Sequence, residues 1–281
     1  MKRSLTLVLC GILAFSLMLG AAGCSKKTEP KETVKKEFKV GLECAYAPFN
    51  WTQTDDSNGA VAISGSKEFA GGYDVEIAKK IADGLDRELV IVKTSWAGLT
   101  PAVQSGTIDA IIAGMSPTAE RKKTIDFTDN YYKSDLVMVV KKGSTYEKAK
   151  SIQDFSGAKV TAQLDTFHYT VIDQIKGVKK QTAMDDFAAM RVALESGIID
   201  GYVSERPEGV SASTANPKFA MVEFVAGQGF QASDDDVAIA VGMKKGNPDQ
   251  AQINEILAGI SEADRKAMMD TAIKNQPSAG K

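Results

Sequence analysis

The sequence predicts an α/β protein with two similar lobes, each a β-sheet flanked by helices, and two strands crossing between them. From Phe38 onward, strand patterns alternate with helix patterns along the chain. A helix–turn–strand unit also occurs twice. The helix 99–106 leads into the strand Ile111–Ala113, and the helix 187–197 leads into the strand Tyr202–Val203. Both units share Ser-Gly-x-Ile-Asp, in which Gly caps the helix and Asp turns the chain into the strand.

The stretch 111–121 predicts where a ligand is held. It begins as an apolar run typical of a strand buried on both faces. We expect a helix to open at Thr118, with Arg121 about one turn inside it. The free N–H groups of a helix N-terminus and a planar guanidinium both suit a carboxylate. The alternative is an ordinary strand–helix junction with a solvated Arg.

The first half of the folded chain alternates strands, loops and helices. Phe38–Leu42 alternates as a strand does, and the loop after it carries Glu43 and three aromatic residues, of which Phe49 is expected in the core. The polar, Gly-rich segment 52–71 predicts a short hairpin near residues 60–63. The further elements are a helix over 72–85 with one apolar face, a strand over 89–92, and a loop bearing Trp96.

The second half supplies the connections between the lobes. Apolar strands over 136–140 and 237–243 are the predicted crossing and return crossing. Between them we expect a capped helix at 151–155, strands at 159–162 and 178–182, and a helix ending at Ile175. The segment 247–274 predicts two helices that cover the first lobe.

Composition excludes several function classes. The chain has 281 residues with 34 Lys and Arg against 36 Asp and Glu, and no basic stripe for nucleic acid. His168 is the only histidine, so no His-rich metal cluster can form, and we expect neither a metal nor a cofactor. His168 itself is expected on a helix surface.

Residues 1–23 predict an export signal. Lys2 and Arg3 precede an apolar stretch, and small residues then precede Cys24. That arrangement is typical of a lipoprotein signal, in which Cys24 becomes the acylated (palmitate-bearing) first residue; a retained anchor helix and a plain secretory signal are the alternatives. Residues 24–37 predict a solvated tether. Cys44 is then the only thiol in the folded chain, so no disulfide within the chain is available.

Several motifs together resemble one family. They are Ala-Gly-x-Ser-x-Thr-x-Glu-Arg-Lys-Lys at 113–123, the following 125–129 and 131–132, the loop 43–51, Trp96, and Ser204-Glu205. From Phe38 to the C-terminus the chain resembles amino-acid-binding proteins of ABC transporters, the polar amino-acid branch of the type II periplasmic binding proteins. The resemblance implies the two-lobe periplasmic-binding-protein-like fold, with 38–137 and 233–281 as lobe 1 and 138–232 as lobe 2.

The resemblance also implies roles for individual residues. Arg121 would hold the ligand α-carboxylate with Ser116, while the Gly114 carbonyl and the Glu205 carboxylate would hold the α-ammonium. Tyr46 and Trp96 would sandwich the side chain of the ligand. The rest of the pocket would be lined by Glu43, Gln163, Asp165, Thr166 and Phe167. Asp165 is commonly Gly in the family and Glu205 commonly Asp, which leaves the ligand class intact but not the exact ligand.

Spare acids in the pocket indicate a cationic ligand side chain. Glu43 and Asp165 remain after Arg121 and Glu205 have met the two charges of an amino acid, and a buried carboxylate requires a partner. Aromatic faces favour cations as well. We therefore expect lysine or arginine, then histidine, ahead of glutamine. The alternative is that Asp165 caps the following helix and Glu43 stays solvated.

Other classes fit less well. An enzyme on the same fold would need a nucleophile, but no Gly-x-Ser-x-Gly elbow is present and Ser116 precedes a proline. A sensor domain would need a signalling module after residue 281. We expect a monomeric, lipid-anchored binder on the extracytoplasmic face of the cell membrane. It would close on its amino acid and deliver it to the permease and ATPase of a transporter.

Overall fold

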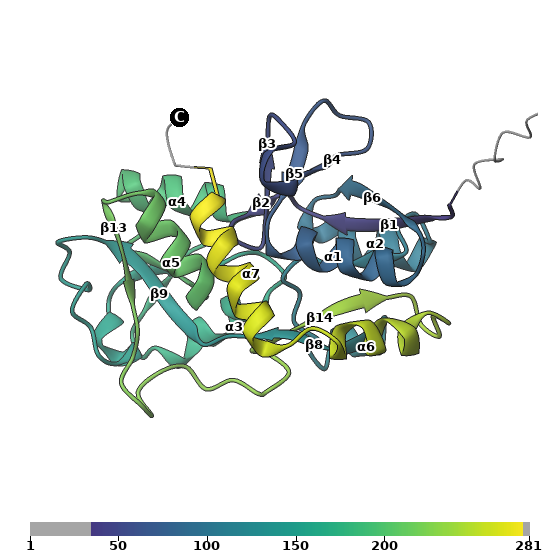
Figure 1. The fold of residues 1–281 in the computed structure, drawn as a ribbon. Coiled ribbons are helices and arrows are strands. Elements are labelled where there is room, and N and C mark those ends of the chain that lie inside the picture. Colours follow the sequence, from purple (N-terminus) through teal and green to yellow (C-terminus); the bar gives the residue numbers. More distant parts are fainter. Residues whose placement is uncertain (1–34, 278–281) are drawn as a thin grey trace, which may run out of the picture. The chain divides into compact units, whose positions relative to one another are not determined.

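Two five-stranded sheets organise residues 35–277, the part of the chain that the computed structural model describes (Figure 1). The first has the order β6-β1-β7-β14-β8 and the second β11-β10-β12-β9-β13. A smaller sheet, β2-β3-β5-β4, stands beside the first. The predicted signal at 1–23, Cys24 and all but the last residues of the predicted tether lie outside the described residues. Strand β1 begins at Glu37, the final residue of that tether.

The first sheet and the elements around it come from both ends of the described chain. Its strands are β1 (Glu37–Leu42), β6 (Glu88–Lys93), β7 (Ala110–Ile111), β8 (Asp126–Lys133) and β14 (Ala238–Met243). The small sheet contains β2 (Ala45–Tyr46), β3 (Asn50–Gln53), β4 (Val61–Ala62) and β5 (Phe69–Gly71), with the 3-10 turn η1 (Ser57–Gly59). The helices are α1 (Tyr73–Gly84), α2 (Trp96–Ser105), α6 (Gln250–Ala258) and α7 (Glu262–Asn275), with the 3-10 turn η2 (Arg121–Lys123).

The second sheet is formed by the middle of the chain. Its strands are β9 (Leu136–Lys141), β10 (Lys159–Thr161), β11 (Lys179–Lys180), β12 (Gly201–Glu205) and β13 (Phe219–Val222). The helices are α3 (Phe167–Val171), α4 (Phe187–Ser196) and α5 (Arg206–Ala215), with 3-10 turns η3 (Ile152–Phe155) and η4 (Ile172–Gln174). Turn η3 has the predicted cap, a reciprocal pair between Ser151 and Asp154.

The two crossings lie at the ends of strands and not within them. The apolar runs predicted as crossings are β9, which belongs wholly to the second sheet, and β14, which belongs wholly to the first. The chain passes between the sheets at Ser134 and Asp135 and returns just before Ala238. The Ser134 N–H donates to the Val237 carbonyl at 3.0 Å, so the two passages are joined side by side.

The repeated Ser-Gly-x-Ile-Asp motif forms the same turn in both places, as predicted. Gly106 and Gly197 end α2 and α4 with the same left-handed conformation, φ 81° in each. Asp109 then accepts the Lys39 N–H at 2.8 Å, and Asp200 accepts the Lys159 N–H at 2.8 Å. Each aspartate thereby ties its turn to the neighbouring parallel strand of its sheet.

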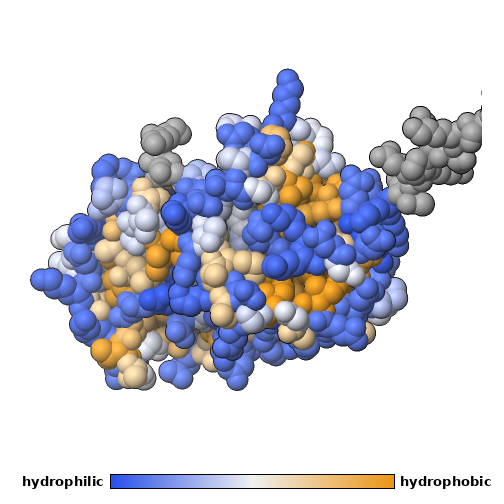
Figure 2. Space-filling view, in the orientation of Figure 1, coloured by the Kyte–Doolittle hydropathy of each residue, from blue (hydrophilic) through white to orange (hydrophobic). Residues whose placement is uncertain are grey.

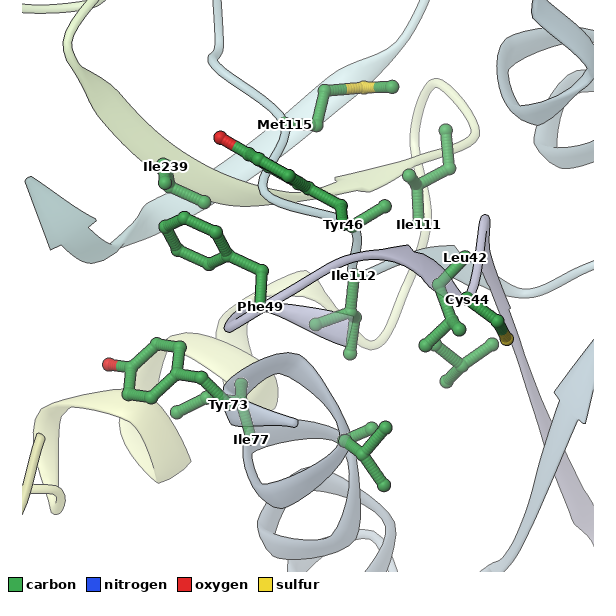
Figure 3. Close-up of a cluster of buried hydrophobic side chains, with 14 of the residues drawn as sticks. Leu42, Cys44, Tyr46, Phe49, Tyr73, Ile77, Ile111, Ile112, Met115 and Ile239 are labelled. Carbon is green, nitrogen blue, oxygen red and sulfur yellow. The ribbon is translucent and has the colours of Figure 1, made fainter. Parts of the chain in front are cut away.

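The core beside the first sheet carries most of the aromatic packing. Tyr46, Phe49 and Tyr73 are buried together, with Phe49 between the two tyrosines in Figure 3. Helix α1 turns its apolar stripe toward this cluster, as its 3.6-residue period predicts. Hydrophobic residues also show between α1 and α6 on the face drawn in Figure 2, where Ile256 packs closely on Gly84.

The last helix contacts helices that flank each of the two large sheets. Helix α7 lies against α1 and also against α5 (Figure 1). The Ser211 hydroxyl on α5 donates to the side chain of Gln276, just past the end of α7. No helix within residues 35–277 is both long and apolar enough to span a lipid bilayer.

Candidate functional site

A small cavity gathers most of the predicted ligand-binding residues. Its lining consists of Tyr46, Trp96, Gly114, Ser116, Arg121, Gln163, Thr166, Phe167, His168 and Phe187. The enclosed space is about 10 Å³, room for about one water molecule. An amino acid can enter only if the lining side chains move apart. Of the predicted residues, Glu43, Asp165 and Glu205 are not in this lining.

Larger hollows occur elsewhere, but among the described residues none that lines them has a buried side-chain polar atom in need of a partner. One of about 780 Å³ is lined by Tyr132, Arg206, Arg265 and neighbouring residues. None of its described lining residues has a buried side-chain polar atom without a partner, whereas several such atoms surround the small cavity. Buried polar groups are normally hydrogen-bonded. We therefore take the small cavity as the candidate site.

Arg121 is held in place from two directions. Its Nη1 donates to the Ser116 carbonyl at 2.9 Å, and its Nη2 donates to the Asp165 carbonyl at 3.0 Å. The guanidinium carbon lies 4.9 Å from the centre of the Trp96 ring, a cation–π contact. Desolvation lowers the pKa of Arg121 to about 10, although nearby acids, Asp165 foremost, oppose that shift. The side chain therefore remains a cation at neutral pH.

The prediction that a helix begins at Thr118 is wrong. The structure has only the 3-10 turn η2, which begins at Arg121 itself. Strand β8 begins at Asp126, and its buried Phe127 must face the core, so the chain has room for a single turn. Thr118 does accept the Arg121 N–H, at 3.3 Å. The site thus relies on the Arg121 guanidinium and not on a helix N-terminus.

The three predicted acids have different environments. Glu43 is buried, and its Oε1 accepts from the Gln163 amide at 3.0 Å. Burial raises the pKa of Glu43 to about 8, although the hydrogen bond from Gln163 lowers it in part. Glu205 is 1% exposed at the end of β12. Asp165 is exposed, so it contributes its carbonyl oxygen to Arg121 but no buried charge.

The structure contradicts the alternative in which Glu43 stays solvated and Asp165 caps the following helix. Glu43 is buried and not solvated, and the N-cap position of α3 is Thr166, one residue after Asp165. Asp165 has a positive φ of 57°, a conformation that costs little for Gly and more for other residues. This is the position where the resembled family commonly has Gly.

His168 is buried in the site, so the prediction of a helix-surface position is wrong. It is 6% exposed on α3, and its Nε2 lies 3.4 Å from Oε1 of Glu205. Within residues 35–277, neither of its ring nitrogens has a hydrogen-bond partner, and the same is true of Oε2 of Glu205. Helix α3 is short, and its face that carries His168 points toward the protein interior. The local sequence around His168 contains no pattern that predicts this orientation.

The two aromatic residues predicted to sandwich the ligand side chain both line the cavity, each against a different neighbour. Tyr46 stacks on Phe187, with ring centres 4.3 Å apart and planes 11° from parallel. Trp96 faces the Arg121 guanidinium instead. Sequence reasoning missed Phe187, whose only local signal is its place at the start of a helix that follows Asp186. The Asp186 carboxylate accepts the Ala189 N–H, as an N-cap does.

The site lies where open α/β sheets commonly bind ligands. Glu43 follows β1, Gly114 and Ser116 follow β7, Gln163 follows β10, and Glu205 ends β12. Among the described residues, no group of three or more His, Cys, Asp or Glu side chains is arranged to hold a metal ion. The arrangement offers one guanidinium, two buried carboxylates and aromatic faces. It can bind a small molecule that carries both charges.

This fold is that of a two-lobe substrate-binding protein. The chain belongs to the bacterial extracellular solute-binding proteins, family 3, whose model matches residues 38–271. It is thus an extracytoplasmic solute-binding protein of the kind that serves ABC transporters, as the sequence motifs predicted.

Relatives with known names and structures span several ligands. The chain is 30% identical over 279 residues to the probable histidine-binding protein of Campylobacter jejuni, covering 98% of each chain. It is 30% identical over 262 residues to the L-cystine-binding protein TcyJ of Escherichia coli, covering 90% of each. The L-arginine-bound crystal structure of AbpA from Streptococcus pneumoniae matches with a TM-score of 0.71 at 26% identity, covering 85% of this chain and 94% of that one.

Proposed function

We propose that this protein captures one free L-amino acid in the small cavity, with the order lysine or arginine, then histidine, then glutamine. The observation that carries the proposal is the set of buried polar atoms without partners around the cavity. Among the described residues they are Oη of Tyr46 and both ring nitrogens of His168, which belong to the lining, and Oε2 of Glu205 and Oε2 of Glu43, whose carboxyl groups contact the lining residues His168 and Gln163. Each gains a partner if a polar, charged ligand lies among them.

The two charges common to all amino acids have matching groups. Arg121 takes the α-carboxylate with its planar guanidinium, helped by the N–H and hydroxyl of Ser116. The Gly114 carbonyl and the Glu205 carboxylate take the α-ammonium. Thr166 and Phe167 add contacts from the other lobe.

The charge of Glu43 favours a cationic ligand side chain. Its Oε1 accepts from the lining residue Gln163, and its Oε2 has no partner in the part of the chain that the structure describes. A lysine or arginine side chain would stabilise the ionised form of Glu43, whereas glutamine would leave it protonated and uncharged. The arginine-bound neighbour and the probable histidine-binding relative also support a basic ligand.

The protein then acts by binding and release, without chemistry. The elements of the first sheet would move as lobe 1 and those of the second sheet as lobe 2, about the paired passages at Ser134 and Val237. An amino acid held by groups from both lobes favours the closed form. That form would dock on the permease and ATPase of the transporter, while a lipid on Cys24 keeps the monomeric protein at the cell membrane.

Paired variants test the amino-acid site by calorimetry with a panel of amino acids. Glu205→Gln is expected to raise the Kd more than about 50-fold, because it removes the ammonium partner. Glu208→Gln is the control: Glu208 is an equally buried acid three residues on, bound by Arg191 at 2.7 Å and Tyr202 at 3.0 Å. It should cost stability but leave the Kd within about threefold.

A second pair tests the carboxylate partner. Arg121→Lys is expected to raise the Kd at least about tenfold, because an ammonium cannot replace the planar fork. Arg87→Lys removes a comparable fork, which binds Asp249 at 2.7 and 2.9 Å, but lies outside the cavity lining. Tight binding of amino acids by both Glu205→Gln and Arg121→Lys would overturn the site. Tight binding of glutamine with none of lysine or arginine would overturn the ligand class.

A further inference from the structure

A buried chain of hydrogen bonds, here called the relay, ends at Gly114 in the lining of the candidate site. The Gly114 N–H donates to the Tyr131 hydroxyl at 3.3 Å, and that hydroxyl donates to Oδ1 of Asp74 at 2.7 Å. The other oxygen, Oδ2 of Asp74, accepts from the Asn50 amide at 2.9 Å. The Asp74, Tyr131 and Asn50 side chains are all 0% exposed. No water is needed to complete this chain of contacts.

Gly114 is a position where the backbone must be controlled. It lines the cavity and has φ of +62°, a conformation that L side chains rarely adopt. An added Cβ would lie 2.6 Å from the Tyr46 ring, so the backbone packs directly on an aromatic of the site. A glycine has many accessible conformations, and its peptide stays in one of them only if neighbours hold it.

We infer that Tyr131 is a positioning residue: its hydroxyl, anchored on Asp74, holds the N–H side of Gly114 and thereby limits where the Gly114 carbonyl, in the next peptide unit, can point for ligand binding. The inference rests on the proposed function, in which the Gly114 carbonyl accepts from the α-ammonium. Tyr131 itself does not line the cavity. It lies on β8, three residues before the passage at Ser134, so the relay also connects the ligand contact to a strand that leads into the hinge.

Tyr131→Phe removes only the hydroxyl and tests the relay. We expect the Kd for the amino acid to rise about tenfold, since the Gly114 N–H and Asp74 lose their shared partner. An analogue of the same ligand that lacks the α-ammonium should lose less than about twofold. Tyr73→Phe is the matched control, because Tyr73 is equally buried and its hydroxyl donates to the Tyr131 carbonyl at 3.0 Å but does not reach Gly114. Its Kd should stay within about twofold.

Asp74→Asn provides the conservative rescue. Asn keeps an oxygen that accepts from the Tyr131 hydroxyl, and Asn50 can turn its amide to offer Oδ1, which has no partner in the present arrangement. We expect a Kd within about threefold of the natural protein. NMR should show the Gly114 amide signal moved in Tyr131→Phe and unmoved in Asp74→Asn.

The outcomes separate this inference from the proposed function. If the natural protein binds no amino acid, the proposed function fails. If it binds, and Tyr131→Phe binds equally well or weakens the analogue as much as the amino acid, only the relay fails. If the Tyr131→Phe protein does not fold, the relay is tested on the natural protein by hydrogen exchange. The Gly114 amide is expected to exchange with deuterium slowly. Exchange as fast as in exposed loops would overturn the relay.

Discussion

The amide Nε2 of Gln163 donates to Oε1 of Glu43 at 3.0 Å and joins residues 120 positions apart in the chain. Glu43 follows the first strand of one sheet, and Gln163 follows a strand of the other. Burial at this contact raises the pKa of Glu43 to about 8. The protonation of Glu43 is therefore coupled both to folding and to what binds beside it.

Glu43→Gln should change how stability depends on pH. A carboxyl whose pKa is raised by folding stabilises the native state below its unfolded pKa, and this stabilisation is lost as the pH rises through about 8. The variant mimics the protonated acid and keeps an acceptor for Gln163. Because the loss begins at the unfolded pKa of about 4.5 and is complete near 8, we expect urea unfolding to show nearly equal stability at pH 4 and a variant more stable by about 4 kcal/mol at pH 8.5.

The same variant reports on the ligand class. At pH 7, lysine or arginine should ionise Glu43 and release up to about one proton from the natural protein, and none from Glu43→Gln. Calorimetry in two buffers with different heats of ionisation measures that number. A stability difference that is the same at both pH values would contradict the raised pKa.

Tyr46→Phe should stabilise the ligand-free protein. The Tyr46 hydroxyl is buried without a partner, while its ring keeps its contacts with Phe49 and Phe187. Removing an unsatisfied polar group should add about 1 kcal/mol and raise the Tm by about 2–4 °C.

Tyr202→Phe is its control and should act in the opposite direction. The Tyr202 hydroxyl donates to Glu208 at 3.0 Å, so its removal leaves a buried carboxylate short of a donor. Thermal unfolding of both variants should give shifts of opposite sign. A loss of stability in Tyr46→Phe would show that its hydroxyl has a partner after all.

Two adjacent isoleucines in the second repeated turn should respond differently to the same change. Ile198 is 60% exposed and stands where the first turn has Thr107, whereas Ile199 is 1% exposed. Ile198→Thr should alter the free energy of unfolding by less than about 0.5 kcal/mol. Ile199→Thr should cost about 2 kcal/mol or more, because it places a hydroxyl in the core. Equal effects in denaturant unfolding would contradict the different burial of these two side chains.

The sequence contains enough local information for most of the fold. The repeated turns, helix α1 and the cap at Ser151 follow from periodicity and from residues a few positions apart. The helix at Thr118 was wrongly predicted because the early start of β8, set by pairing with β14, limits the turn. A partner strand more than 100 residues away decides that boundary.

The sequence predicts the site residues that belong to a recognisable motif. It does not predict the residues whose place in the site is determined by tertiary packing. The resemblance identified eight residues that line the cavity, including Arg121 and Trp96. It did not reveal that Phe187 covers one face of Tyr46, or that His168 turns toward Glu205. Both depend on how helices of the second lobe pack against the first, and no local pattern in the chain encodes that.

Helix α7 contacts both α1 and α5. If the lobes move about the hinge, α7 must therefore move relative to at least one of these two helices. Its last turn is accessible at Lys274. A fluorophore attached there would change its surroundings whenever the lobes part, without standing in the path of the amino acid. The end of the described chain is thus a natural place to build an optical sensor.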